Sequence, residues 1–150
     1  MAGRGARVDY RQLQRMQRKI QRLGQDYEKF LESMTKEIAA RMLRKVIDRT
    51  PVADPSAWKT PVTGYVGGTL RRGWTVDTTV KKLGNTYQIE VFNPTEYAQY
   101  VEFGHRTSNH QGWVNGRFMM TISADEIDQQ APAIIERKLT RMLREAFDGD

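Results

Sequence analysis

Residues 13–47 read LQRMQRKIQRLGQDYEKFLESMTKEIAARMLRKVI, and their spacing predicts one long amphipathic helix. Apolar side chains recur at alternating steps of three and four, which is the seam of a helix lying along another helix. The stripe comprises Leu13, Met16, Ile20, Leu23, Tyr27, Phe30, Met34, Ile38, Met42 and Val46, widened by Leu31, Ala39, Leu43 and Ile47. Gly24 is a weak point at which the helix could bend or split. Pro51 ends it, because a proline disfavours helical geometry in the residue before it.

A loop and then a hairpin are expected after this helix. Prolines and glycines are frequent from Thr50 to Thr69, and a loop of that length is usually functional or mobile. A period of two follows, on either side of a turn at Gly84 and Asn85. The two strand faces are Trp74, Val76, Thr78 and Val80, and then Tyr87, Ile89 and Val91. This pattern predicts an antiparallel pair of strands.

A short helix and an exposed loop are expected next. Asn93 and Pro94 break the second strand, and the following residues predict a helix over Glu96–Phe103 that Gly104 ends. The stretch His105–Arg117 is polar, contains glycine and has no period, so it is interpreted as an exposed loop.

The C-terminal part predicts a second long helix. Arg117–Ile122 is expected to be a short strand or turn, and Ser123 with Glu126 matches a capping box that opens the helix. Pro132 disrupts helical geometry, so the helix is expected to be kinked there or to begin nearby. Two long helices on a small antiparallel sheet, with long exposed loops, define an α+β fold.

The charge divides the chain into two parts. The formal net charge is +6, and residues 1–22 hold seven basic residues against one acid, Asp9. The basic residues are Arg4, Arg7, Arg11, Arg15, Arg18, Lys19 and Arg22. We interpret residues 1–22 as a basic arm that starts the long helix, and residues 23–150 as a single domain. Such an arm suits an acidic protein surface or a nucleic-acid backbone, and the alternative is a solvated helix face.

The composition excludes several classes of protein. The sequence has no cysteine, which rules out a disulfide framework, a thiolate metal site and a cysteine nucleophile. No apolar run approaches the roughly 20 residues that span a bilayer. The N-terminus lacks the apolar core of a secretion signal, so we expect a cytoplasmic protein without a membrane contact.

Residues with catalytic or metal-binding patterns are scarce. The two histidines, His105 and His110, are interpreted as exposed loop residues rather than a metal pair, because no third ligand accompanies them. No phosphate loop or nucleophile elbow is present. We therefore expect no enzyme activity, no cofactor, no metal and no small-molecule substrate.

Two further residues stand out by their surroundings. Glu102 lies in an otherwise apolar stretch, so its carboxylate needs a partner, for which Arg71, Arg72 and Arg106 are candidates. A structural ion pair or a subunit contact is favoured over a catalytic acid. Trp113 lies among glycine and polar residues, and it either forms an interface hot spot or folds back onto the sheet.

The block Tyr97-Ala-Gln-Tyr-Val-Glu-Phe-Gly-His-Arg106 resembles the signature of the tail-completion, or minor tail component, proteins of long-tailed phages. Pro61-Val-Thr-Gly64, Leu70-Arg-Arg-Gly-Trp74 and Gly116-Arg-Phe-Met119 match other parts of that pattern in the same order. The segment between Gly64 and Leu70 is expanded, and the basic arm is longer than the pattern requires.

The resemblance implies a structural virion protein of the phage neck, assembled in the host cytoplasm. It implies a homo-oligomeric ring, a hexamer, between the connector or portal side and the tail terminator or tube. The rival interpretation is a nucleic-acid-binding module that uses the basic helix, with DNA in the channel as a possible contact. The residues expected at interfaces are Arg4, Arg7, Arg11, Arg15, Arg18, Tyr65, Arg71, Arg72, Glu102, His105, Arg106, His110, Trp113 and Arg117.

Overall fold

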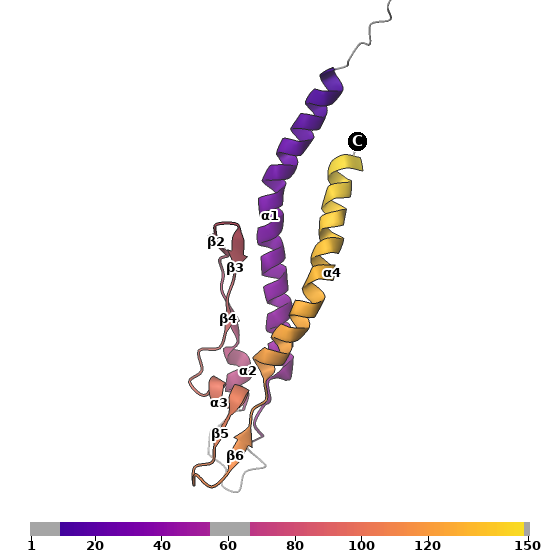
Figure 1. Cartoon of the computed structure of the whole chain (residues 1–150). Coiled ribbons are helices and arrows are strands. Elements are labelled where there is room, and N and C mark those ends of the chain that lie inside the picture. The colour runs from indigo at the N-terminus through magenta and orange to yellow at the C-terminus, as the bar shows by residue number, and fades with distance from the viewer. Residues whose placement is uncertain (1–9, 55–66, 149–150) are drawn as a thin grey trace, which may run out of the picture.

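Two long antiparallel helices form the body of the molecule, and a narrow β-region lies along one side and one end of it (Figure 1). The computed structural model describes residues 10–54 and 67–148. The helices are α1 (Tyr10–Arg49), α2 (Thr69–Gly73), α3 (Ala98–Phe103) and α4 (Met119–Asp148). The strands are β1 (Thr75–Val76), β2 (Lys81–Leu83), β3 (Thr86–Gln88), β4 (Val91–Phe92), β5 (Gly104–Arg106) and β6 (Trp113–Asn115). The predicted α+β class is confirmed.

The long helix α1 is unbroken through Gly24 and ends one residue before Thr50. Thr50 is fully buried, and its hydroxyl donates to the Val46 carbonyl at 2.5 Å while accepting from the Trp74 indole at 2.6 Å. Its carbonyl accepts from Nε of Arg71 at 3.0 Å. These bonds satisfy the end of α1 and fix α2 beneath it.

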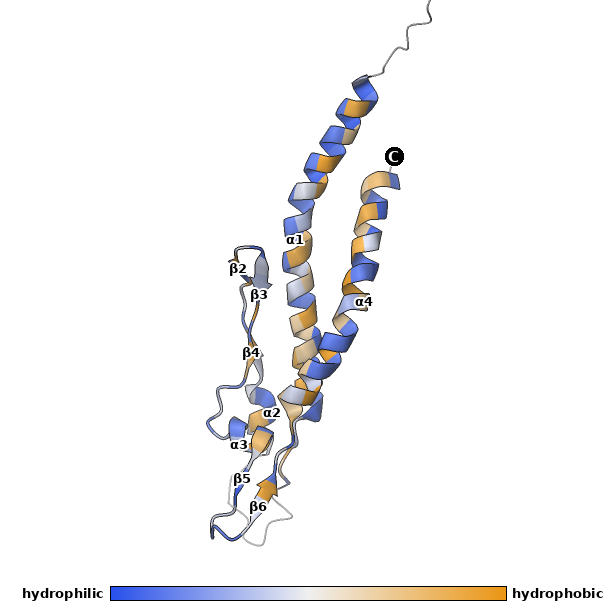
Figure 2. Ribbon diagram, in the orientation of Figure 1, coloured by the Kyte–Doolittle hydropathy of each residue, from blue (hydrophilic) through white to orange (hydrophobic). Residues whose placement is uncertain are grey.

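The core lies where the lower halves of α1 and α4 meet. Seven apolar side chains are buried among the described residues: Met34, Ala39, Val46, Leu70, Met119, Ile127 and Ile134. The apolar stripes of both helices are visible as orange bands in Figure 2. The predicted packing of the α1 stripe against another helix is therefore confirmed for its second half.

A charged cluster joins the two helices beside this core. Glu126 of α4 accepts a hydrogen bond from Lys45 Nζ at 2.7 Å and a second from the Arg49 guanidinium. Further along, Lys138 Nζ donates to Glu37 at 2.5 Å. The hydrogen bond from Lys45, with the positive charge of Arg49, holds the pKa of the Glu126 carboxyl below its ordinary value of 4.5.

The Glu126→Gln variant should lose a small, pH-dependent part of the stability. A lowered native pKa means that the ion pair stabilises the fold above the unfolded-state pKa, and that this contribution disappears as the pH falls through the native value. The effect is small because the Glu126 side chain is 35% exposed and water screens the pair. Melting curves of both proteins should therefore differ at pH 7 and converge in strong acid. If the difference between the two melting temperatures grew as the pH fell, this account would be contradicted.

The expected hairpin is present but divided into two ladders. Strand β2 pairs with β3 and β1 pairs with β4, both antiparallel. Gly84 has a φ of +61° in the predicted turn, which glycine adopts without strain. The regular alternation expected over Trp74–Val80 is wrong, because residues 77–80 leave the ladder. A single bond from the Asp77 N–H to the Glu90 carbonyl (2.9 Å) links the two ladders.

The interpretation of His105–Arg117 as an exposed loop is wrong in part, because β5 and β6 form a second hairpin there and residues 107–112 make up its loop. Its turn is closed by Thr107, whose N–H donates to the Gly112 carbonyl at 3.0 Å and whose hydroxyl accepts from the Gly112 N–H at 3.0 Å. The hairpin returns so tightly that a Cβ on Gly116 would lie 2.2 Å from the Glu102 carbonyl oxygen. These strands have only three residues each, too short to show a period in the sequence.

The start of α4 is also corrected. The helix begins at Met119, so the strand or turn expected over Arg117–Ile122 is wrong, and Ser123 is a fully buried residue inside the helix rather than its cap. The helix continues through Pro132 and does not begin near it, and Figure 1 shows that α4 bends along its length. The five-residue α2 was not predicted, and the short helix α3 begins two residues later than expected.

Candidate protein-interaction surface

The first turns of α1 project beyond the rest of the molecule (Figure 1). The pairs Lys45–Glu126 and Glu37–Lys138 set the antiparallel register of α1 and α4. Extending that register places the end of α4 opposite Tyr27. Residues 10–23, which we call the projecting segment, therefore lie past the C-terminal end of α4. At 1.5 Å per residue the segment is about 20 Å long.

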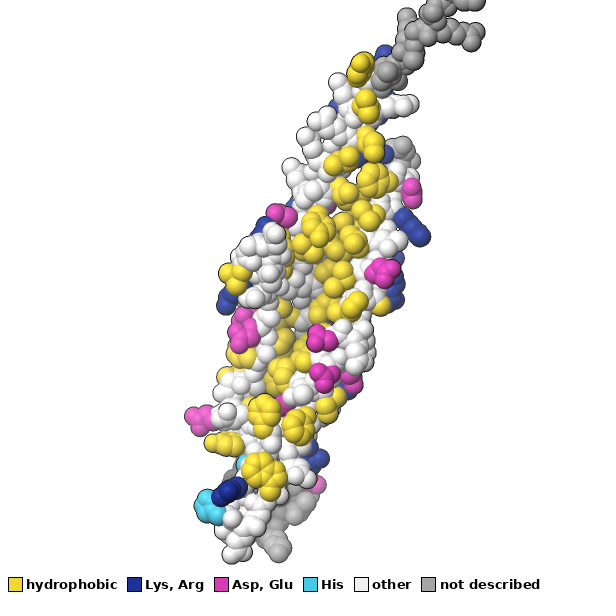
Figure 3. All heavy atoms as spheres, in the orientation of Figure 1, with side chains coloured by type: hydrophobic (Ala, Val, Ile, Leu, Met, Phe, Trp, Pro, Cys, Tyr) yellow, Lys and Arg dark blue, Asp and Glu magenta, His cyan; other side chains and the backbone are white. Residues whose placement is uncertain are grey.

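The projecting segment carries an uncovered apolar stripe. Leu13, Met16 and Ile20 are 56%, 55% and 52% exposed, whereas Met34 and Val46 of the same stripe are buried. Figure 3 shows the apolar side chains as a band that runs from this end of the molecule down over α1 and α4. A helix end of this length is marginal in water without packing, so the stripe requires a partner surface.

An open apolar groove lies below the projecting segment, between α1, α4 and the β1–β4 hairpin. Its volume is about 790 Å³, and Met34, Ile38 and Ile127 are among the residues that line it. Asp77 and Glu90 from the hairpin and Asp128 from α4 add acidic groups, against one lysine, Lys81. Figure 3 shows acidic side chains bordering the apolar band in this part of the molecule.

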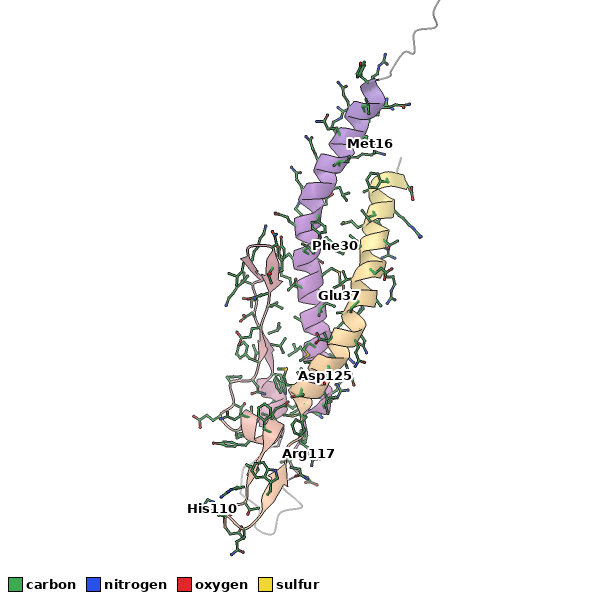
Figure 4. All side chains as sticks on the ribbon, in the orientation of Figure 1. Met16, Phe30, Glu37, His110, Arg117 and Asp125 are labelled. Carbon is green, nitrogen blue, oxygen red and sulfur yellow. The ribbon has the colours of Figure 1, made fainter. Side chains whose placement is uncertain are left out.

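The opposite end of the molecule presents a second exposed surface, formed by the β5–β6 hairpin and its neighbours. Phe103 and Phe118 are 61% and 42% exposed, and their rings meet edge to face with centroids 6.4 Å apart. Trp113, at 59% exposure, does not fold back into the core. Figure 4 places His110 at the tip of this end and Arg117 just above it, far from Met16 at the other end.

Glu102 has a structural environment different from the one expected. Its side chain is buried, and its two carboxylate oxygens accept the backbone N–H of Met120 at 2.9 Å and the N–H and hydroxyl of Thr121 at 2.8 Å each. The expected arginine partners are wrong. The carboxylate instead caps the N-terminus of α4, where unpaired N–H groups and the helix dipole favour a negative charge.

The other predicted interface residues fall into four groups. Arg71 and Arg72 of α2 donate to backbone carbonyls of Thr50 and Gly67, so both support the local fold. Arg11, Arg15 and Arg18 lie exposed on the projecting segment, while His105, Arg106, His110, Trp113 and Arg117 cluster at the far end. Arg4, Arg7 and Tyr65 lie outside the described residues.

Sequence reasoning missed the groove, because its walls come from three separate elements.

These surfaces suit contact with other proteins. In residues 10–54 and 67–148, no group of His, Asp and Glu side chains is arranged to hold a metal ion. Of the large apolar side chains described, sixteen are exposed and six are buried in the core. Where such side chains are contiguous, as in the stripe of the projecting segment, they mark a site of association.

One protein-family model matches more than half of the chain. Residues 14–104 match the model of the HK97-gp10-like family, described as a tail component of bacteriophage HK97. The chain belongs to this family. The match runs from α1 through α3 and includes Glu102, while α4 lies beyond it. No curated protein and no solved structure matches the chain.

Membership of the HK97-gp10-like family confirms the resemblance seen in the signature block, and it supports a structural role in a phage tail. None of the helices in the described part of the chain has the length and apolarity needed to cross a membrane.

Proposed function

We propose that this phage tail component is a ring-forming subunit of the neck, which links the connector to the tail terminator or tube. The observation that carries the proposal is the apolar surface of α1, which packs in its second half and is uncovered in its first. A monomer in water would leave that stripe exposed, whereas a neighbouring subunit would bury it.

The two ends of the molecule favour different partners. The projecting segment and the groove are distinct surfaces, and contacts between unlike surfaces generate closed rings when the rotation between subunits closes. The β5–β6 hairpin lies at the other end of the molecule, with Arg106, Trp113 and Arg117 beside or on it, where it can contact the next component of the virion. We infer a hexamer from the family resemblance, without catalysis and without a cofactor.

The arginines of the arm add an electrostatic role. Arg11, Arg15, Arg18 and Arg22 recur at steps of four, three and four, so they share a helix face roughly opposite the apolar stripe. When the stripe is buried, this basic face remains outside, where it suits an acidic protein surface or DNA in the channel.

The native mass of the purified chain tests the proposal. We expect a mass six times the 17.4 kDa of one chain, measured by native mass spectrometry and by sedimentation velocity. Adding the connector or the tail-terminator protein of the same particle should shift the ring to a larger complex. A single-chain mass at every concentration, with no binding to either protein, would refute the proposed function.

A further inference from the structure

The projecting segment and the groove match one another in size and polarity. Residues Leu31 to Met42 of α1 form one wall of the groove, a length of about 17 Å at 1.5 Å per residue. The projecting segment is about 20 Å long and presents one apolar stripe. One face of a four-turn helix therefore fits along the groove.

Their charges are also complementary. The projecting segment contains five basic residues and no acid, whereas the groove brings three carboxylates together with one lysine. Opposite net charges draw the two surfaces together at long range. Because the arginines lie on the face away from the stripe, docking the stripe leaves them near water and buries no unpaired charge.

The groove of a given chain is out of reach of its own projecting segment. Both belong to α1, which is one continuous helix from Tyr10 to Arg49, and the groove is built on its second half. The segment that fills a groove must therefore come from another molecule.

We propose that the projecting segment of a second copy of this chain occupies the groove between α1, α4 and the hairpin. The inference rests on the proposed self-assembly and identifies the contact that produces it. Each subunit then donates one helix and accepts one, as an amphipathic helix bound in an apolar groove.

Engineered cysteines can test this contact cleanly, because the sequence has no cysteine of its own. The double variant Ile20→Cys/Ala131→Cys places one thiol on the stripe and the other in the groove. Oxidation of the assembled protein should give disulfide-linked multimers on a non-reducing gel. The matched control is Ile20→Cys/Ala133→Cys, because Ala133 is an exposed residue of α4 outside the groove.

The pattern of products separates the possible outcomes. A ladder longer than two chains in the groove variant, with little cross-linking in the Ala133 control, supports the inference. A ladder that stops at two chains supports the contact but shows reciprocal exchange, which overturns the ring. Cross-linking of Ile20→Cys alone to the same extent would mean that the projecting segments pair with each other, and it would overturn the inference.

The native mass keeps the inference separate from the proposed function. If the unmodified chain forms the ring but the groove variant forms no disulfides, the projecting segment binds something else and only the inference fails. Binding of a duplex oligonucleotide that Arg15→Glu/Arg18→Glu abolishes without changing the mass would then assign the segment to DNA. If the unmodified chain is a monomer at every concentration, both the proposed function and the inference fail.

Discussion

Replacing Glu102 with alanine should destabilise the protein strongly. The carboxylate is buried and caps the first turn of α4 through three hydrogen bonds, so the variant removes the acceptor of the N–H groups of half-buried Met120 and of exposed Thr121. A lost cap together with unpaired donors costs about 2–4 kcal/mol. For a chain of this size that lowers the melting temperature by roughly 5–15 °C. Circular dichroism at 222 nm, at one fixed protein concentration, measures the shift.

Two companion variants show whether capping is the cause. Glu102→Gln keeps the shape and one oxygen acceptor but loses the charge, so its melting temperature should fall between those of the alanine variant and the unmodified protein. Glu96→Gln removes an exposed carboxylate from the residues just before α3 and should change little. Equal melting temperatures for Glu102→Ala and Glu96→Gln would show that α4 does not depend on this cap.

The sequence identified Glu102 correctly as a desolvated carboxylate, and it misidentified the partners. A buried acid suggests an arginine partner, and Arg71, Arg72 and Arg106 were the candidates. Two of the three true donors are backbone N–H groups, which every residue except proline has, so no side-chain pattern can reveal them. The capping box at Ser123 and Glu126 placed the helix start four residues too late, which concealed the proximity of Glu102 to Met120.

The long helices were predictable because their information is local. A stripe with a 3.5-residue period repeats many times along α1 and survives one glycine. The strands of two or three residues are different, because each is defined by its partner rather than by its own sequence. Strand β6 is exposed at all three positions, so no apolar alternation could mark it.

The interaction surface was predictable in kind but not in place. The heptad seam indicated a helix that needs a partner, and α4 supplies that partner only as far as its C-terminal end opposite Tyr27. The part of α1 that α4 covers depends on the register of the two helices, and the sequence did not give that register. Predicting the groove would have required knowing that the hairpin lies beside both helices, and that arrangement is a property of the whole fold.

The double variant Met16→Gln/Ile20→Gln should weaken assembly strongly and leave the folded subunit unaffected. Both side chains are about half exposed in the single chain, so their removal costs the monomer little, whereas the contact loses about 1.5–3 kcal/mol of apolar burial. That difference raises the dissociation constant about 10- to 150-fold. Glutamine keeps the helix propensity close to that of methionine, so α1 should remain intact. Sedimentation velocity over a concentration series measures the loss. The control is Leu83→Gln, because Leu83 is 59% exposed beside the β2–β3 turn and is not among the residues that line the groove. If both proteins assembled equally well, the stripe of the projecting segment would not be a subunit contact, and the uncovered half of α1 would have to serve another partner.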